Sequence, residues 1–292
     1  MGRRRSFCIA LTAAVVTVVT TSVVHAAGPS TAPASTAGRA MLRQLAGVNF
    51  ISTCRFSHRA GDDPIVFPGL PGVSHDHSFV GNVSTNAFST LATLRGAATT
   101  CQRPGDTAAY WMPTLLVNGS VVEPVGATIY YRRHTLAPTQ PFPAGLKIVA
   151  GNSHATAQQD LRVVFWNCGV ESGIARSATP PTCPGTRAAG LRLHVTFPDC
   201  WNGKSLDSAD HHGHMSYSER GQCPLGYPVP VPAISVIFRY PTTGGPTTTL
   251  SSGGPLTGHA DFFNAWNQTA LARLVTTCLD ALRHCGRASD HH

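Results

Sequence analysis

Charged side chains are scarce in this sequence: Asp, Glu, Lys and Arg make up only 12% of its 292 residues. Lysines and arginines outnumber the acids and give a formal net charge of +8, but the arginines are scattered along the chain. A nucleic-acid-binding surface needs a dense basic patch, so this distribution predicts that the protein has no nucleic acid partner. A mildly basic chain can still bind an acidic polymer.

Long apolar runs are also missing, except at the N-terminus. The basic residues 3–5 are followed, from Phe7 to Val24, by apolar or small residues with no acid, glycine or proline. This pattern is typical of an export signal, and Val24 and Ala26 fit the small-residue positions before a cleavage site. We expect residues 1–26 to be a signal peptide, and the mature protein to be secreted, extracellular and without membrane contacts.

The sequence contains no C-x-x-C motif, which argues against a cysteine zinc cluster or a redox thiol pair. Of its nine cysteines, Cys8 lies in the signal, so the mature chain keeps an even number, and this favours four disulfides in an exported protein. Neighbouring positions suggest the pairs Cys54–Cys101, Cys168–Cys183 and Cys200–Cys223. The other two, Cys278 and Cys285, would lie about 10 Å apart on an unbroken helix, which is too far for a disulfide. Either the helix ends between them or the pairing differs.

Glycine and proline are abundant, with 28 and 22 residues, and they disfavour long helices in the interior. Residues 191–197 alternate between apolar and polar side chains, which predicts a strand with one wet face. Asn118-Gly119 lies between two β-rich runs and predicts a tight hairpin turn. Further strands are expected at 146–150, 161–166 and 233–240.

The C-terminal part has a helical periodicity. Apolar residues recur at this spacing from Phe263 to Leu282, which predicts one amphipathic helix with Asp261 or Asn264 as its N-cap and Gly286 as its stop. We therefore predict an all-β or β-dominated fold, a two-sheet sandwich or jelly roll stapled by disulfides, with this helix packed on it. The predicted parts are a flexible leader at 27–40, a single domain at 41–286 with a long surface loop at 241–258, and a tail at 287–292. The product is expected to be a monomer.

His75 and His77 form an H-x-H triplet. On a strand both imidazoles point to one face, so they can offer two nitrogens to one metal ion. Double-stranded β-helix metalloenzymes follow such a pair with a glutamate a few residues later, but Gly81 and Asn82 occupy those positions here. The third ligand of a cupin-type site is therefore missing. The alternative is that both histidines are structural hydrogen-bonding residues.

A denser group of titratable side chains lies between 206 and 215, in a polar segment with a glycine that predicts a loop. Its members are Asp207, Asp210, His211, His212 and His214. One chemistry that fits is a divalent metal site in which His211 or His214 joins the H-x-H pair. The other is acid–base catalysis, with Asp207 or Asp210 orienting His211 or His214. The alternative is an aspartate N-cap beside solvated histidines.

Three aromatic residues are candidates for substrate binding: Trp111, Trp201 and Tyr217. An aromatic ring in the wall of a cleft can stack on a sugar ring, and Trp201 shortly precedes Asp207 in the chain. The alternative for each ring is a place in the core.

An ordered set of short motifs covers nearly the whole mature chain, from about Asn49 to Cys278. It includes Asp63-Pro64-Ile65-Val66, His75-x-His77-x-Phe79-x-Gly81, Tyr110-Trp111-x-Pro113, Phe197-Pro198-x-Cys200-Trp201, Leu206-Asp207-Ser208, Asp210-His211, His214-Met215 and Asp261-Phe262-Phe263-Asn264-x-Trp266. This order resembles the family catalogued as domain of unknown function 1996, found in secreted bacterial and fungal proteins. Asn202 and Gly213 depart from the family pattern, which often has aspartate and serine there, but the titratable side chains are intact.

The family name assigns no activity, but the resemblance implies a context. Members often occur beside carbohydrate-binding modules, and both histidine motifs belong to the family's motif set, which implies one shared site. The implied function is a secreted carbohydrate-active protein, a polysaccharide hydrolase or lyase with a His/Asp site that a divalent metal could assist. A polysaccharide or cell-wall glycan would be its partner. The alternative is a non-catalytic extracellular module that binds polysaccharide or metal.

Overall fold

The computed structural model describes Gly2 and residues 36–286, except for 104, 170–172 and 186–189. The expected signal peptide apart from Gly2, residues 27–35 of the expected leader and the tail at 287–292 lie outside the described residues. Within the described part, no helix has the length and apolar character that crossing a membrane requires.

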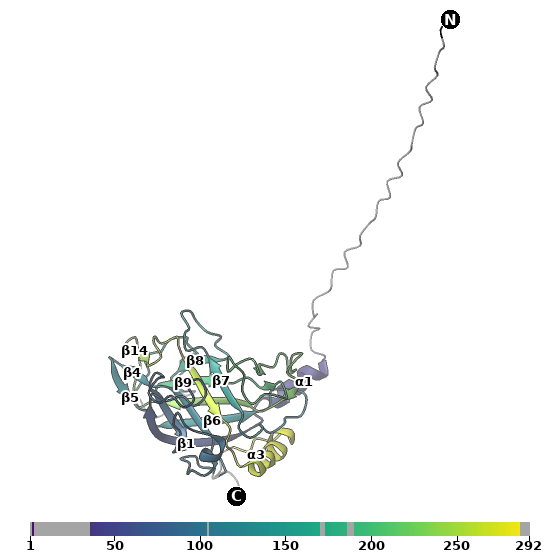
Figure 1. Cartoon of the computed structure of the whole chain (residues 1–292), viewed down its shortest axis with the longest axis horizontal. Helices are drawn as coiled ribbons and strands as arrows, with labels where there is room; N and C mark the ends of the chain where they lie inside the picture. Colours follow the sequence, from purple (N-terminus) through teal and green to yellow (C-terminus); the bar gives the residue numbers. More distant parts are fainter. Residues whose placement is uncertain (1, 3–35, 104, 170–172, 186–189, 287–292) are drawn as a thin grey trace. The chain divides into compact units, whose positions relative to one another are not determined.

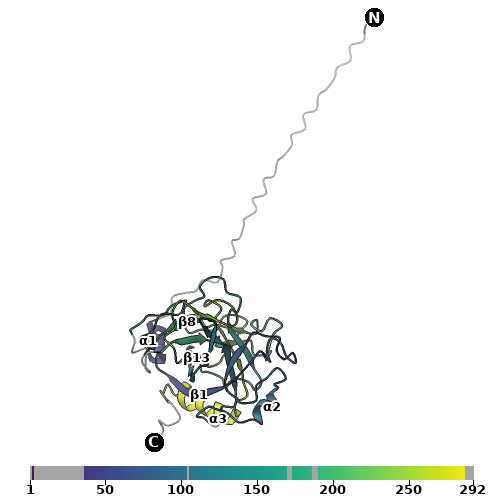
Figure 2. The ribbon, with the colours of Figure 1, turned by 90° about the vertical axis from the view of Figure 1, so that its left-hand side faces the viewer.

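Most strands of the described chain belong to one antiparallel sheet of nine. In spatial order they are β7 (Lys147–Gly151), β15 (His259–Phe263), β3 (Ala109–Pro113), β2 (His77–Gly81), β1 (Asn49–Ala60), β6 (Gly126–Arg132), β13 (Ala233–Arg239), β9 (Arg192–Thr196) and β8 (Val164–Asn167). Two three-stranded sheets accompany it, one of β11 (Met215–Ser216), β10 (Cys200–Trp201) and β12 (Val229–Pro230), the other of β14 (Thr248–Leu250), β4 (Leu115–Val117) and β5 (Ser120–Val122). The helices are α1 (Thr36–Leu45), α2 (Leu91–Arg95), α3 (Gln268–Leu274) and the π-helical turn η2 (Val275–Asp280). Helix α3 lies beside β1 in both views (Figures 1 and 2).

Strand β1 joins two halves of the large sheet. Its residues 49–55 pair with β6, its last residues pair with β2, and the register shifts between Phe56 and His58. One half is therefore β7-β15-β3-β2 and the other is β6-β13-β9-β8, with β1 common to both. The halves face each other across one core, so the predicted β-dominated, sandwich-like fold is confirmed, although the two layers are continuous through β1.

The core lies between the inner faces of the two halves. Phe262 of β15 packs on Tyr110 of β3 with 5.3 Å between ring centroids, and it approaches Phe197, which follows β9, at 6.3 Å. At the ends of the sheet, a Cβ on Gly151 of β7 would lie 3.1 Å from a methyl of Val164 on β8. The glycine therefore lets these two edge strands approach each other, and the sheet nearly closes.

Most of the strands expected from the sequence are present. Strand β9 buries Leu193 and Val195 and leaves its alternate residues partly exposed, as the alternation predicts. Asn118 and Gly119 join β4 to β5 with φ of 50° and 77°. Both angles lie in the left-handed region that a two-residue hairpin turn of this kind requires.

The C-terminal helix begins later than predicted. Residues 259–263 form β15, a strand buried along its whole length, so Asp261 is not an N-cap. The N-cap is Asn267 rather than Asn264, and its side chain accepts a hydrogen bond from the backbone N–H of Ala270. The strand is short and buried on both faces, and its apolar residues merge with the pattern of the following helix.

All four expected disulfides are present. They join Cys54 to Cys101, Cys168 to Cys183, Cys200 to Cys223 and Cys278 to Cys285. The helical turn ends at Asp280, and Leu282 has a φ of 55°, so the chain reverses between the last two cysteines. Their Cα atoms are 5.7 Å apart, which is an ordinary spacing for a disulfide.

Two predicted boundaries change. Helix α1 begins at Thr36, so residues 36–40 are helical rather than part of a flexible leader. Its sequence contains Ala, Met, Leu, Arg and Gln, which are strong helix formers. Within the expected loop at 241–258, residues 248–250 form β14 and pair with β4, and Thr248 and Leu250 are buried.

Candidate metal centre

The outer face of the β7-β15-β3-β2 half carries the polar site. Because side chains alternate along a strand, His259 and Asp261 of β15 face outward while Ala260 and Phe262 enter the core. The register places Asp261 between Trp111 of β3 and Val149 of β7. The chain that enters β2 brings the H-x-H pair to the same face.

Three imidazoles converge there: His75, His77 and His259. One ring nitrogen from each lies within 4.8 Å of the other two, and the Nε2 atoms of His75 and His259 are 3.2 Å apart. Two nitrogens that each bind a tetrahedral zinc at about 2.1 Å are separated by about 3.4 Å, so this spacing suits two ligands of one ion.

Backbone carbonyls fix the orientation of two of these rings. Nδ1 of His77 donates to the carbonyl oxygen of Asp62 at 3.0 Å, and Nδ1 of His259 donates to that of Thr257 at 2.8 Å. A carbonyl can only accept, so the proton is on Nδ1 and the lone pair is on Nε2. This is the arrangement that neighbouring groups impose on metal-binding histidines. Nε2 of His77 is buried and has no hydrogen-bond partner.

Burial keeps all three imidazoles neutral, which is the form that binds metals. It lowers the pKa of His75 to about 4 and that of His259 to about 3, and it lowers the pKa of His77 well below its usual value. The neighbouring histidines contribute to the last two shifts because like charges repel.

Two buried carboxylates lie beside the imidazoles. Asp261 is 1% exposed, and neither of its oxygens has a hydrogen-bond partner. Burial, together with the charge of Asp63, raises its pKa well above the usual value. Asp63 accepts hydrogen bonds from the backbone N–H groups of Ile65 and Val66, and ligand atoms of Asp63, His77 and Asp261 also lie within 4.8 Å of one another. Unpaired buried carboxylates are costly unless a cation compensates them.

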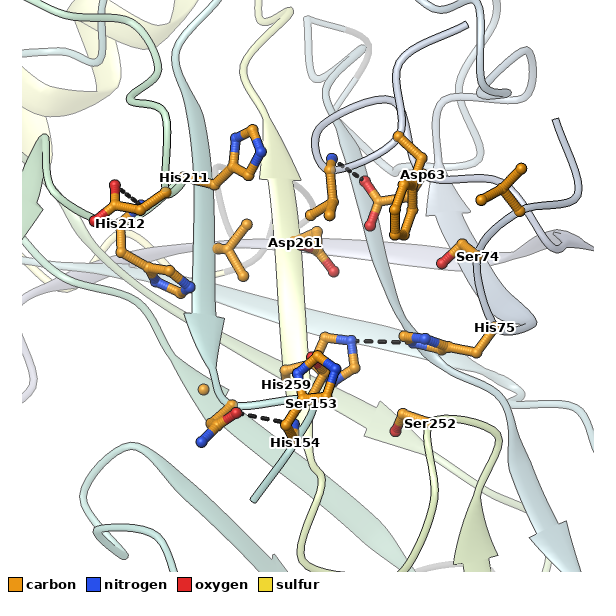
Figure 3. A pocket seen from close by; sticks show the side chains of 17 residues that line it. Asp63, Ser74, His75, Ser153, His154, His211, His212, Ser252, His259 and Asp261 are labelled. Atoms are coloured by element: carbon orange, nitrogen blue, oxygen red, sulfur yellow. Dashed lines mark hydrogen bonds between the residues drawn. The ribbon is translucent and has the colours of Figure 1, made fainter. Parts of the chain in front are cut away.

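A cavity of about 450 Å³ opens onto this group. His75, His259, Asp63 and Asp261 line it, together with His154 and other polar residues. Figure 3 shows Asp261 on β15 between His259, Asp63 and His211. Four of the five donors therefore border an open pocket, whereas His77 is completely buried and is not among the lining residues.

The predicted loop at 207–214 reaches the same cavity through Asp210, His211 and His212. Nδ1 of His211 lies 2.9 Å from Oδ1 of Asp207, and the other carboxylate oxygen of Asp207 lies 3.7 Å from Nζ of Lys147. The two predicted clusters thus meet at one pocket. In the described part of the chain, however, the groups that could hold an ion at this pocket contain neither His211 nor His214, and the third imidazole is His259.

Two of the predicted catalytic residues have structural partners instead. His214 is completely buried, and its ring nitrogens contact the Ser208 hydroxyl at 2.9 Å and the Lys147 carbonyl at 2.7 Å. Both nitrogens are occupied, so the ring has none left for a metal or for substrate. Asp210 accepts from the Gly213 and His212 N–H groups and from the Ser208 hydroxyl, which lowers its pKa and closes the loop.

The three residues predicted to stack on sugar rings differ in their exposure to solvent. Trp111 is fully buried beneath the site, so its ring cannot stack on a substrate and that prediction is wrong. Trp201 is half-buried and donates from Nε1 to the Ser205 carbonyl. Tyr217 is 38% exposed and lines an adjacent cavity that His212 also lines.

Sequence reasoning missed His259, Asp261 and Asp63 as site residues. A usable signal was present, because His259 and Asp261 alternate with Ala260 and Phe262 in a short strand pattern. Asp63 and Asp261 also stand in two of the motifs that carried the family resemblance.

Comparison with known proteins agrees with that resemblance. No curated protein and no solved structure matched the chain. The model of one protein family matches residues 63–266, which include the three imidazoles, both buried carboxylates and the 207–214 loop. The chain therefore belongs to the family described as Domain of unknown function (DUF1996).

Proposed function

We propose that this protein is a secreted, metal-dependent enzyme that cleaves polysaccharide, with the ion held by His75, His77 and His259 beside the carboxylate of Asp261. One observation carries the proposal: three neutral imidazoles form one donor group, and His77 of this group also lies within reach of the buried, unpartnered Asp261, at a pocket lined by His75, His259 and Asp261. The donor set is typical of a first-row divalent transition metal such as Zn²⁺ or Mn²⁺.

The open pocket favours catalysis over a structural role for the ion. Structural zinc sites are closed by four protein ligands, whereas catalytic sites keep a position for water or substrate. Here His75, His259 and Asp261 face a cavity of about 450 Å³, which is large enough for sugar units. Ser74, Ser153, Ser252 and Asn152 line it and can form hydrogen bonds with sugar hydroxyls.

His211 is the candidate for proton transfer in this pocket. Asp207 holds its Nδ1, which leaves Nε2 to take or give a proton, in the way that a carboxylate orients a general base. A bound divalent ion would act as a Lewis acid on a substrate oxygen. An electrophile together with a proton-transfer group serves both hydrolysis and β-elimination, so a hydrolase and a lyase share this arrangement.

Export is part of the proposal and has separate support. Four disulfides are typical of proteins that work in oxidising surroundings outside the cytoplasm. The N-terminal sequence has the pattern of an export signal.

The first test measures metal binding by the mature protein, residues 27–292. Elemental analysis and calorimetry with Zn²⁺ and with Mn²⁺ should give about one ion per chain for one of these metals. His259→Gln should weaken binding by more than about 100-fold, because even loss of a supporting group around a metal site costs about 10–100-fold. His154→Gln is the matched control, since this exposed histidine lines the same cavity but belongs to neither donor group.

The second test measures activity on a panel of polysaccharides with and without a chelator. New reducing ends without ultraviolet absorbance indicate hydrolysis, and unsaturated ends that absorb indicate elimination. Chelation or His259→Gln should abolish either product, while His154→Gln should not. Metal binding without product on any polymer would support the alternative of a non-catalytic binding module. Equal metal binding by His259→Gln and the wild type would reject the site.

A further inference from the structure

A second cavity lies on the outer face of the other half of the sheet. It has a volume of about 610 Å³ and is bordered by β6, β13, β9 and β8. Its lining includes four arginines, Arg132, Arg162, Arg176 and Arg192, and none of the described lining residues is acidic. It shares no lining residue with the pocket of the metal centre.

Strand alternation explains why this face is polar. Leu193 and Val195 of β9 enter the core, so Arg192, His194 and Thr196 face outward. Across the sheet, Ser235 of β13 stands opposite Thr196 and also opposite Tyr130 of β6. The wet face therefore combines arginines with hydroxyl groups.

Aromatic rings hold two of the guanidinium groups in place. That of Arg132 lies 4.2 Å from the ring centre of Tyr130, and that of Arg176 lies 4.4 Å from the ring centre of Phe165. Phe165 in turn stacks on His194 at 4.1 Å. Stacking uses the flat face of a guanidinium and leaves its N–H edge able to bind an anion.

Carboxylates of the protein neutralise this charge only in part. Arg162 pairs with Asp160 at 2.6 Å, but in the described part no carboxylate pairs with Arg132 or Arg176. Burial, together with the charges of Arg192, Arg176 and Arg132, lowers the pKa of His194 to about 3. Positive potential therefore converges on the floor of the cavity.

We propose that this groove binds an anionic polysaccharide, with uronate carboxylates of the polysaccharide held by Arg132 and Arg176. Arginine forms paired hydrogen bonds with carboxylates, and Ser235, Thr196 and Asn167 offer hydrogen bonds to sugar hydroxyls. The groove binds this polysaccharide whether or not the metal centre holds an ion. It selects the polymer, while the chemistry takes place on the other face of the domain.

The surroundings favour a glycan over a nucleic acid. Single-stranded nucleic acids need exposed aromatic faces on which bases stack. The rings of Tyr130 and Phe165 are instead covered by arginines and by His194. A duplex requires a long basic stripe, and the arginines of this chain are scattered outside the groove.

Calorimetry and affinity electrophoresis with sodium polygalacturonate test the proposal on the mature protein. Arg132→Gln and Arg176→Gln should each weaken binding about tenfold, the loss expected for one charge-assisted contact. Arg95→Gln and Arg273→Gln are the matched controls, because these exposed arginines lie on α2 and α3, outside the groove, and change the net charge equally. They should change binding less than twofold. Arg176 is exposed, so its variant folds even if that of the partly buried Arg132 does not.

Other ligands and a chelator complete the experiment. Neutral dextran should not bind, dextran sulfate should bind more weakly than polygalacturonate, and EDTA should leave binding unchanged. The proposal is overturned by equal losses in groove and control variants, by absence of polygalacturonate binding, or by tighter binding of DNA. Loss of binding in EDTA would indicate that the polymer binds at the metal centre instead. Failure of the metal-binding tests alone would not contradict polysaccharide binding in this groove.

Discussion

The substitution Asp261→Asn should affect the stability of the metal-bound protein differently from that of the metal-free protein. In the metal-free protein the Asp261 carboxylate is buried, lacks hydrogen-bond partners and has Asp63 beside it. A buried unpaired polar group costs about 1–3 kcal/mol, so removing this carboxylate should not lower the free energy of unfolding. With an ion bound, the same carboxylate attracts the metal, and the substitution removes that attraction.

Linkage gives the size of the effect. A metal present at about 100 times its Kd raises the free energy of unfolding by about 2.7 kcal/mol. This corresponds to about 5–10 °C in Tm for a domain of this size. If Asp261→Asn weakens binding about 100-fold, the same metal concentration adds only about 0.4 kcal/mol. Thermal and chemical unfolding of EDTA-treated protein, with and without Zn²⁺, measure both quantities.

Asp199→Asn is the control for this prediction. Asp199 is also buried, but its carboxylate accepts hydrogen bonds from the N–H and the hydroxyl of Ser218, both at 2.7 Å. This variant should lose about 1–2 kcal/mol with or without Zn²⁺ and keep the full metal-induced shift. The reasoning fails if Asp261→Asn destabilises the EDTA-treated protein as Asp199→Asn does and keeps that shift.

Three further predictions concern catalysis, covalent structure and pH. Asp207→Asn should lower turnover about 10²–10⁴-fold on an identified polymer with little change in Tm. His214→Ala should mainly destabilise the fold. Equal turnover in Asp207→Asn and wild type would show that the pair of Asp207 and His211 is structural. Thiol titration of the unfolded, unreduced mature protein should find less than about one thiol per chain, and a higher value would contradict the four disulfides. Burial raises the pKa of Asp106 from 3.8 to about 7; its contribution to stability is therefore complete below about pH 4 and is lost as the pH rises toward 7. The stability difference between wild type and Asp106→Asn should decrease over that range, and a constant difference would refute the shift.

The strands that could be predicted from the sequence are those with one wet face. In β9, polar and apolar residues alternate because only one side is buried, and the Asn118-Gly119 turn needs backbone angles that few other residue pairs tolerate. Strand β15 was missed because all five of its residues are buried. Its polar residues therefore do not mark a solvent-exposed face, and the local pattern does not distinguish the strand from the start of the following helix.

The candidate site was predicted only in part for a related reason. The H-x-H pair is local and could be found, but its third imidazole comes from a strand 184 residues after His75 and reaches it through the register of the sheet. His214 belongs to the same dense cluster as His211, yet its burial against Ser208 and Lys147 depends on how the loop folds back. Composition can predict that titratable groups gather, while only tertiary structure decides which of them keep a free nitrogen.

The position of β15 in the chain has a consequence for how the protein matures. This strand lies in the interior of its half-sheet, between β3 and β7, yet it follows all the other described strands in the chain. A nascent chain that has delivered Asp63, His75 and His77 still lacks the donors on β15 and cannot retain an ion through them. Under the proposed function, capture of the ion would therefore coincide with completion of the sheet, and a chain truncated before β15 would not bind an ion at this site.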